Sequence, residues 1–247
     1  MANILFFTKE KKQKLHEVSR YLVDKINFAS TLKKMKDSYL HKGLRKKLVE
    51  ELRTKGIANE KLLEAFNKIP RHLFMDSTFV NFSYKDKAFP IGAGQTISQP
   101  YTVAIQTCLL ELKPLDKVLE VGTGSGYQTA VLLEMGARVY TIERQKELFL
   151  KSQQLLVQMG YKPQFFYGDG YAGLPTYGPF DKILITAGAP EIPQALIDQL
   201  KPGGKMVVPL GPRDSQIMTC LEKDLNNNVK ITEHGNFIFV PMLKGTE

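Results

Sequence analysis

The stretch that most constrains the fold of this chain is a glycine-rich turn, LEVGTGSGYQ (residues 119–128), which continues an apolar run. Glycines permit positive φ angles and let a ligand come close to the main chain. The G-x-G-x-G spacing of Gly122, Gly124 and Gly126 narrowly misses the G-x-G-x-x-G of dinucleotide-binding folds. It also lacks the Lys of a phosphate loop and the G-x-S-x-G of a nucleophile elbow. The turn therefore predicts a strand, a tight turn and a helix that starts near Gly126.

An acidic residue follows this turn at the distance expected of a ribose-binding acid. Glu143 ends the next apolar run, RVYTIE, 21 residues after Gly122. An acid about 20 residues past such a turn accepts hydrogen bonds from ribose hydroxyls. The pattern favours a turn that binds a nucleoside without a pyrophosphate over a turn that binds no ligand. S-adenosylmethionine is such a nucleoside.

Strand and helix patterns alternate around the turn. Apolar strand patterns occupy residues 117–122, 138–143, 164–169, 180–186 and 204–211, and helical patterns such as 144–160 and 191–201 separate them. This alternation predicts an α/β fold, a doubly wound and mostly parallel sheet with helices on both faces. Residues 217–224 and 229–234 predict an antiparallel hairpin near the C-terminus. Helices are expected at 48–57, 59–69 and 101–112, with an irregular segment over 71–100.

Ligands of such sheets bind at the carboxyl ends of the strands, where the strand order reverses. Polar or glycine residues stand at four of these ends, namely Gly122, Glu143, Asp169 and Thr186. We therefore expect the site to form there.

The net charge of +9 is concentrated at the N-terminus. Residues 1–47 hold 13 Lys and Arg against 4 Asp and Glu, so that 21 basic and 21 acidic residues balance over the rest. We expect a basic extension, residues 1–47, that is partly helical or flexible, and a catalytic domain, residues 48–247. Within the extension, apolar residues from Leu15 to Ile26 recur at helical spacing. This pattern fits a membrane-binding or partner-binding helix or a frayed extension, and Met35 is an alternative start.

The remaining features predict a cytoplasmic protein. No run approaches the roughly 18 apolar residues of a membrane span, and the first residues do not resemble a signal peptide. Cys108 and Cys220 are expected to be reduced core thiols because no C-x-x-C pattern or nearby His accompanies them. The four histidines are scattered and are expected to be surface or structural residues: His16, His41, His72 and His234.

Several further segments carry a family resemblance, among them PIGAGQTISQPYTVA (residues 90–104), GDGYAGLP (168–175), LKPGGKMVVPLG (200–211) and FVPMLKG (239–245). With these, the chain from about residue 36 onward resembles the protein-L-isoaspartate O-methyltransferases. The glycine turn and LKPGGKMVV are shared by many class I methyltransferases, whereas GQTISQP and FVPMLKG are far more specific to this family. The resemblance implies methyl transfer from S-adenosylmethionine to the free α-carboxylate of L-isoaspartyl residues in damaged proteins and peptides, which initiates their repair.

The resemblance also implies a role for each matching residue. Ser98 stands at the catalytic position, and Ser98, Val240 and Pro241 match residues that contact the substrate. The residues implied in cofactor binding are Thr96, Ile97, Glu120, Gly122, Thr123, Gly124, Ser125, Gly126, Glu143, Asp169 and Gly170. No metal is expected.

The chemistry is consistent with this interpretation, because a carboxylate with a pKa near 4 is already an anion at neutral pH and needs no base. The expected partners are isoaspartyl proteins and peptides, with no nucleic acid or membrane, and the protein is expected to be a monomer.

Two alternatives remain at this point. One is a class I methyltransferase that acts on RNA through the basic segment, and the other is a scaffold without activity. The sequence leaves peptide preference and activity on D-aspartyl residues open.

Overall fold

The computed structural model describes residues 37–247. The chain divides into two units, Met1–Tyr39 and Leu40–Glu247, and the second contains the α/β fold. The helical pattern between Leu15 and Ile26, His16 and the alternative start at Met35 lie outside the described residues. The first described helix, α2 (Tyr39–Thr54), begins nine residues before the expected helix and runs across the boundary expected after residue 47.

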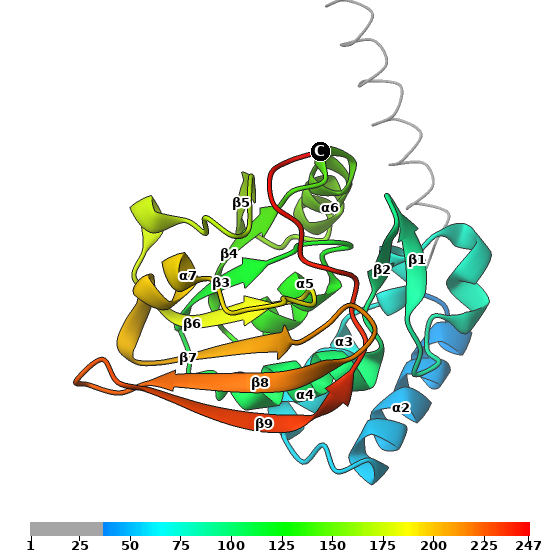
Figure 1. Cartoon of the computed structure of the whole chain (residues 1–247). Coiled ribbons are helices and arrows are strands. Elements are labelled where there is room, and N and C mark those ends of the chain that lie inside the picture. The colour runs from blue at the N-terminus through cyan, green and yellow to red at the C-terminus, as the bar shows by residue number, and fades with distance from the viewer. Residues whose placement is uncertain (1–36) are drawn as a thin grey trace, which may run out of the picture. The chain divides into compact units, whose positions relative to one another are not determined.

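A seven-stranded sheet with the order β5-β4-β3-β6-β7-β8-β9 forms the centre of the fold (Figure 1). The five strands from β3 to β7 pair in parallel, whereas β8 and β9 are antiparallel to their neighbours. The predicted mostly parallel sheet and its C-terminal hairpin are therefore confirmed. The strands are β3 (Lys117–Val121), β4 (Arg138–Glu143), β5 (Gln164–Tyr167), β6 (Phe180–Ile185), β7 (Leu200–Leu210), β8 (Gln216–Lys223) and β9 (Val229–Phe237).

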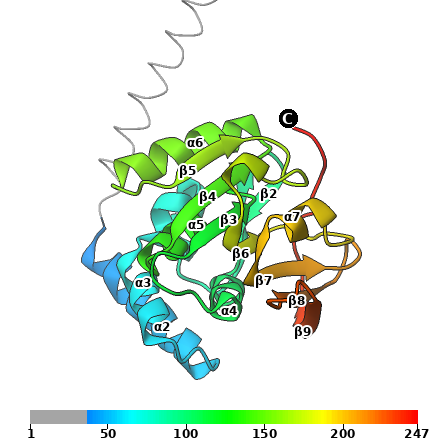
Figure 2. The same cartoon turned by 90° about the vertical axis from the view of Figure 1, so that its left-hand side faces the viewer.

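Helices cover both faces of this sheet (Figure 2). Helices α4 (Pro100–Leu110) and α5 (Tyr127–Glu134) lie on one face and α7 (Gln194–Asp198) on the other, while α6 (Lys146–Gln158) packs against β4 and β5. Because side chains alternate along a strand, each strand contributes to two cores. Val118 belongs to the core that contains Leu110 of α4, and Leu119 to the core that contains Leu196 of α7. Burial on both faces explains the continuous apolar runs of the sequence.

The segment expected to be irregular, residues 71–100, contains short regular elements. After α3 (Glu60–Lys68) come two 3₁₀ helices, η1 (Arg71–Phe74) and η2 (Ser77–Phe82), and then a hairpin of β1 (Phe89–Gly92) and β2 (Gln95–Ile97). Gly92, Ala93 and Gly94 all have positive φ in the hairpin turn. These strands are too short for side-chain alternation to reveal them in the sequence.

The chain after β9 crosses the carboxyl ends of the central strands (Figure 1). The Gly188 N–H, which follows β6, donates to the Val240 carbonyl at 2.8 Å, and the Met242 N–H donates to the Gly188 carbonyl at 2.8 Å. Further on, the Glu247 N–H donates to the Arg144 carbonyl at 2.9 Å. The C-terminal segment, residues 238–247, is thereby fixed over β4 and β6.

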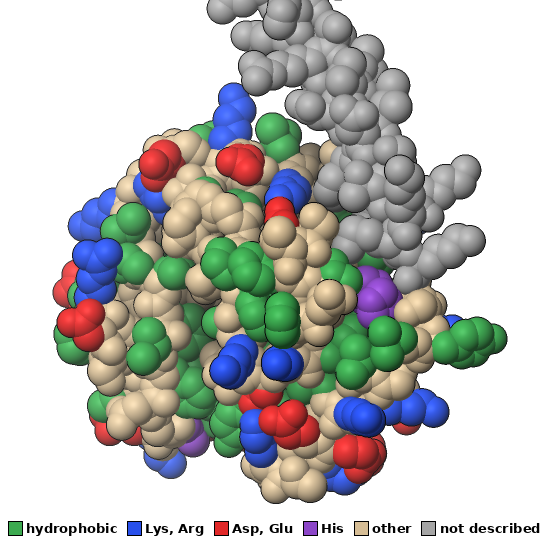
Figure 3. Space-filling model, turned by 90° about the vertical axis from the view of Figure 1, so that its right-hand side faces the viewer, with side chains coloured by type: hydrophobic (Ala, Val, Ile, Leu, Met, Phe, Trp, Pro, Cys, Tyr) green, Lys and Arg blue, Asp and Glu red, His purple; other side chains and the backbone are tan. Residues whose placement is uncertain are grey.

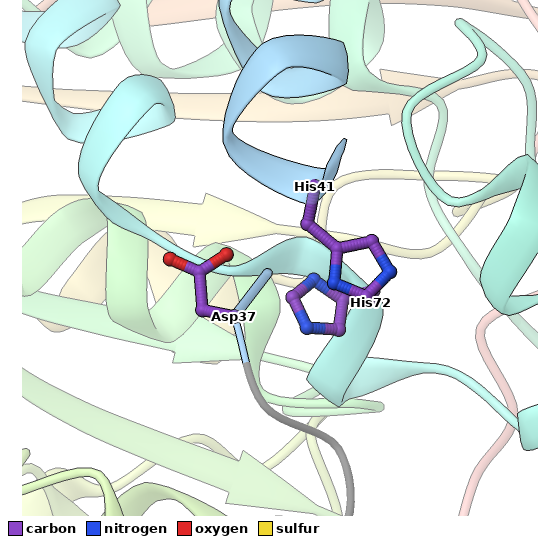
Figure 4. Close-up of side chains that lie close together, drawn as sticks. All are labelled: Asp37, His41 and His72. Atoms are coloured by element: carbon purple, nitrogen blue, oxygen red, sulfur yellow. The ribbon is translucent and has the colours of Figure 1, made fainter. Parts of the chain in front are cut away.

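Two of the four histidines, His41 and His72, lie together in the structure. The rings of His41 and His72 stack with centroids 3.8 Å apart (Figure 4). His72 Nδ1 lies 2.7 Å from the Tyr84 hydroxyl. His72 is buried, so its packing agrees with a structural role.

Both cysteines are free thiols, and burial raises the pKa of each. Within residues 37–247, no helix combines the length and apolarity needed to cross a membrane.

Candidate active site

A cleft that is open to solvent lies at the carboxyl ends of β3, β4 and β6. This is the point where the order of the parallel strands reverses, which is where open α/β sheets bind ligands. Most residues implied by the resemblance line it: Thr96, Ile97, Ser98, Gly122, Thr123, Gly124, Ser125, Glu143, Gly170, Val240 and Pro241. Glu120, Gly126 and Asp169 lie outside the lining.

Packing at the glycine turn requires glycine at its first and last positions. Gly122 has a φ of +96°, and a Cβ there would lie 2.5 Å from Thr186 Oγ1. Gly126, with a φ of +86°, precedes α5, and its Cβ would lie 2.9 Å from Leu156 Cδ1. The Thr186 hydroxyl donates to the Gly122 carbonyl at 2.7 Å. The turn is therefore held in place while its main chain borders the cleft.

Glu143 supports the glycine turn and faces the cleft. Its carboxylate accepts hydrogen bonds from the Gly124 N–H and the Gln145 N–H, each at 2.8 Å. Each carboxylate oxygen has a second lone pair that can accept a further hydrogen bond. Glu143 can therefore accept hydrogen bonds from the hydroxyls of a ribose without giving up the bond that shapes the turn.

Glu120 lies in β3 behind the cleft wall. Its side chain is fully buried, and Oε2 accepts a hydrogen bond from the Thr129 hydroxyl at 2.5 Å. Burial raises the pKa of Glu120 to about 8. The carboxyl group is consequently protonated at neutral pH in this structure.

Asp169 connects the site to the C-terminal segment. Its Oδ1 accepts from the Tyr171 N–H at 2.8 Å and its Oδ2 from the Gly245 N–H at 2.7 Å. The neighbouring Gly170 lines the cleft, and a Cβ there would overlap Val121 Cγ1. Asp169 thus shapes the wall to which Gly170 contributes.

Ser98 lies between β2 and α4 and is half-buried. Its carbonyl accepts a hydrogen bond from Arg71 Nη2 at 2.9 Å, while its hydroxyl bonds to none of the residues that the structure describes. Val240 and Pro241 line the same cleft from the C-terminal segment. The Ser98 hydroxyl, which can donate to a ligand, therefore borders the same cleft as the main chain of Val240 and Pro241.

Other lining residues received no role from the sequence, notably Gln95, Tyr127 and Arg144. Gln95 precedes the implied Thr96, and Arg144 directly follows Glu143, so adjacency is the signal that could have found them. Burial raises the pKa of Tyr127 well above its usual range. Among the lining residues, Glu143 and Arg144 alone carry charge, which suits a nucleoside better than a pyrophosphate.

The fold, the glycine turn and the acid at the end of β4 define a class I, S-adenosylmethionine-dependent methyltransferase. The model of the protein-L-isoaspartate(D-aspartate) O-methyltransferase (PCMT) family matches residues 43–247. The chain belongs to this family.

Individual relatives agree with that assignment. A protein-L-isoaspartate O-methyltransferase of Flavobacterium psychrophilum is 59% identical over 211 residues, covering 85% of this chain and 99% of the relative. The solved structure of a protein-L-isoaspartate O-methyltransferase, 28% identical, superposes with a TM-score of 0.72 over 80% of this chain and 65% of that one. A β-aspartate methyltransferase (PCMT) from Plasmodium falciparum, in complex with S-adenosyl-L-homocysteine, superposes with a TM-score of 0.71 at 24% identity over 81% of this chain and 99% of that one.

Proposed function

We propose that this enzyme methylates the free α-carboxylate of L-isoaspartyl residues in damaged proteins and peptides, and so initiates their repair. The observation that carries the proposal is the placement of Ser98 and of Val240–Pro241 in the walls of one cleft with the glycine turn. Membership of the PCMT family supports the substrate. We further propose that the enzyme acts as a cytoplasmic monomer and without a metal.

The residues of the cleft suit S-adenosylmethionine, which supplies the sulfonium methyl when bound. Glu143 would hold its ribose, the glycine turn its methionine part, and Gly170 would border its adenine. The buried Glu120 and the half-buried Asp169 support these walls through their hydrogen bonds with Thr129 and Gly245.

The task of the protein side chains is positioning. A carboxylate is already ionised at neutral pH, so no proton must be removed from it. The enzyme must place one oxygen in line with the methyl group and exclude water, and such effects are worth several kcal/mol. Ser98 suits this task because its hydroxyl can donate a hydrogen bond to the carboxylate without acting as a strong base.

Selectivity for isoaspartyl residues follows from geometry. An aspartyl residue offers a carboxylate of nearly the same pKa, so charge does not separate the two substrates. In an isoaspartyl residue the main chain is longer by one carbon, and the free group is the α-carboxylate. If Val240 and Pro241 hold the peptide main chain, an aspartyl carboxylate lies about one bond length out of line, where an error of about 1 Å costs roughly 100-fold in rate.

Methylation of an isoaspartyl peptide and its aspartyl twin tests this function, with Ser98→Ala as the variant. We expect the enzyme to methylate the isoaspartyl peptide and not its aspartyl twin. In the Ser98→Ala variant, kcat should fall by a larger factor than peptide affinity. Comparable turnover of the aspartyl twin would refute the proposed selectivity. A wild-type kcat for Ser98→Ala would refute the role of Ser98.

The same assay with RNA as substrate tests the alternative from the sequence. The balanced charge of residues 48–247 argues against an RNA-binding face. On the face shown in Figure 3, basic and acidic side chains are interspersed. We therefore expect no methyl transfer to RNA.

A further inference from the structure

Two charged side chains from a distant part of the chain hold the turn that contains Ser98. This turn, residues 98–101, joins β2 to α4 and includes Pro100 at the first position of the helix. Arg71 of η1 and Asp86, which precedes β1, both bond to it. We call Arg71 and Asp86 the turn anchors.

Arg71 joins η1 to two later main-chain segments from inside the protein. Its side chain is fully buried, Nε donates to the Ser83 carbonyl at 3.0 Å, and Nη2 donates to the Ser98 carbonyl at 2.9 Å. The guanidinium lies 4.7 Å from the centre of the Tyr127 ring, and Tyr127 lines the cleft. Moving the Ser98 carbonyl would leave a buried cation without this acceptor, which is costly.

Asp86 holds the other end of the turn. Its side chain is 3% exposed. Oδ1 accepts from the Tyr101 N–H at 2.8 Å, and Oδ2 accepts from Gln99 Nε2 at 3.0 Å and Lys55 Nζ at 2.6 Å. Gln99 is the N-cap of α4 but makes no side-chain capping bond. Asp86 therefore supplies the cap and a negative charge at the helix N-terminus, both of which stabilise a helix.

The main chain between the two anchored groups has little freedom. Pro100 fixes its own φ and has no N–H, and it restricts Gln99, which precedes it. The anchors bond to the groups that flank this stiff pair, the Ser98 carbonyl and the Tyr101 N–H. The position of the Ser98 main chain, and with it the Ser98 hydroxyl, is thereby set by Arg71 and Asp86.

We infer that Arg71 and Asp86 are positioning residues for methyl transfer, acting through the Ser98 turn and not by contact with the substrate. This inference rests on the proposed function of Ser98. Neither side chain lines the cleft. A displacement of about 1 Å at a reacting group costs roughly 100-fold in rate, so a partly released turn lowers kcat while leaving the rest of the binding surface in place.

Asp86→Asn is the variant to test, because asparagine keeps the shape of the side chain. Its NH₂ group replaces one carboxylate oxygen and cannot accept a hydrogen bond, so one of the donors around residue 86 loses its acceptor. We expect kcat for an isoaspartyl peptide to fall about tenfold, a fraction of the loss for a full 1 Å displacement. The peptide KM and the calorimetric affinity for S-adenosylmethionine should stay within about twofold, since neither depends on the position of one hydroxyl.

Asp181→Asn is the matched control. Asp181 also accepts from a main-chain N–H, that of Lys117 at 2.8 Å, and from a lysine, Lys201 Nζ at 2.6 Å, but it lies at the amino ends of β3 and β6, away from the cleft. We expect a comparable loss of melting temperature and an unchanged kcat. A similar fall in kcat for both variants would show that Asp86 acts through stability alone.

A double-mutant cycle with Ser98→Ala separates this inference from the proposed function. Asp86→Asn should lower kcat in the wild-type background and change it by less than about twofold in the Ser98→Ala background, because coupled residues are not additive. Equal effects in both backgrounds would overturn the inference, whereas a wild-type kcat for Ser98→Ala would overturn the role of Ser98 itself. If Asp86→Asn lacks a cooperative melting transition, Gln99→Ala replaces it in the cycle, with an expected loss of about threefold.

Discussion

The carboxyl group of Glu120 is fully buried, and Thr129 supplies its hydrogen bond. The sequence does not reveal this burial, because it shows only that Glu120 stands in a strand directly before the glycine turn. The structure explains it by the two-sided burial of β3, which leaves no solvated face for the side chain. The charge state of Glu120 is thus a property of the fold and not of the local sequence.

Glu120→Gln should change how stability depends on pH. The pKa of a Glu side chain is 4.5 in the unfolded chain, whereas burial raises that of Glu120 to about 8 in the folded protein. Between these values unfolding releases a proton, so this group lowers stability as pH rises, and it has no further effect above pH 8. From pH 5 to pH 8, the free energy of unfolding of the Gln variant should increase relative to that of wild type by on the order of a few kcal/mol. Urea unfolding of both proteins measures this, and a difference independent of pH would contradict it.

Glu143→Ala should weaken the binding of S-adenosylmethionine by about 1–3 kcal/mol, since charged hydrogen bonds to hydroxyls are lost. Glu143→Gln keeps one acceptor oxygen for the Gly124 N–H and should lose less affinity for S-adenosylmethionine. Comparing the two variants therefore separates support of the turn from contact with the ligand. Titration calorimetry of the three proteins provides the comparison. An unchanged affinity in Glu143→Ala would remove Glu143 from the binding site.

The individual residues of the site differ in how well sequence reveals them. Glu143 and the glycines could be found because they stand at fixed spacing after a strand, where the main chain determines what fits. Arg71 and Asp86 could not, because their contacts with the Ser98 turn join residues 13 to 27 positions apart. Such contacts form only when η1 and the β1–β2 hairpin pack together.

At the scale of elements, the parallel strands were predictable and the N-terminal hairpin was not. Strands β3, β4 and β6 are apolar on both faces and therefore stand out in the sequence. Strands β1 and β2 are short, and about half of their residues are exposed. Their pairing depends on the turn at Gly92–Gly94 and on packing, so composition alone suggested an irregular segment.

Helix α2 offers a test of backbone conformation that involves no side-chain contact. A Cβ at Gly43 or at Gly56 would meet nothing within 4 Å, but Gly43 lies inside the helix and Gly56 has a φ of +93° beyond its end. Gly43→Ala should stabilise the protein by about 0.5–1 kcal/mol, and Gly56→Ala should destabilise it by about 1 kcal/mol. Thermal unfolding measures both. A shift of the same sign in the two variants would contradict this account of α2.

At the scale of the whole molecule, we propose that the catalytic part does not need the basic residues at the start of the chain. The family model matches from residue 43, and the α/β unit begins at Leu40. A chain that starts at Met35 should therefore methylate an isoaspartyl peptide with nearly unchanged kcat and KM. A folded truncation with a large loss of turnover would place part of the function in residues 1–34.

The role proposed for the C-terminal segment also has a consequence for the time at which a newly made chain becomes active. Val240 and Pro241 form one wall of the cleft, and the Gly245 N–H and the Glu247 main chain fix that wall to Asp169 and Arg144. While a ribosome is still making these residues, or holds them in its exit tunnel, the other strands can pair but the cleft has no such wall. With Val240 and Pro241 in the role proposed for them, we expect a growing chain to lack a complete site and methylation to start only after this segment has emerged.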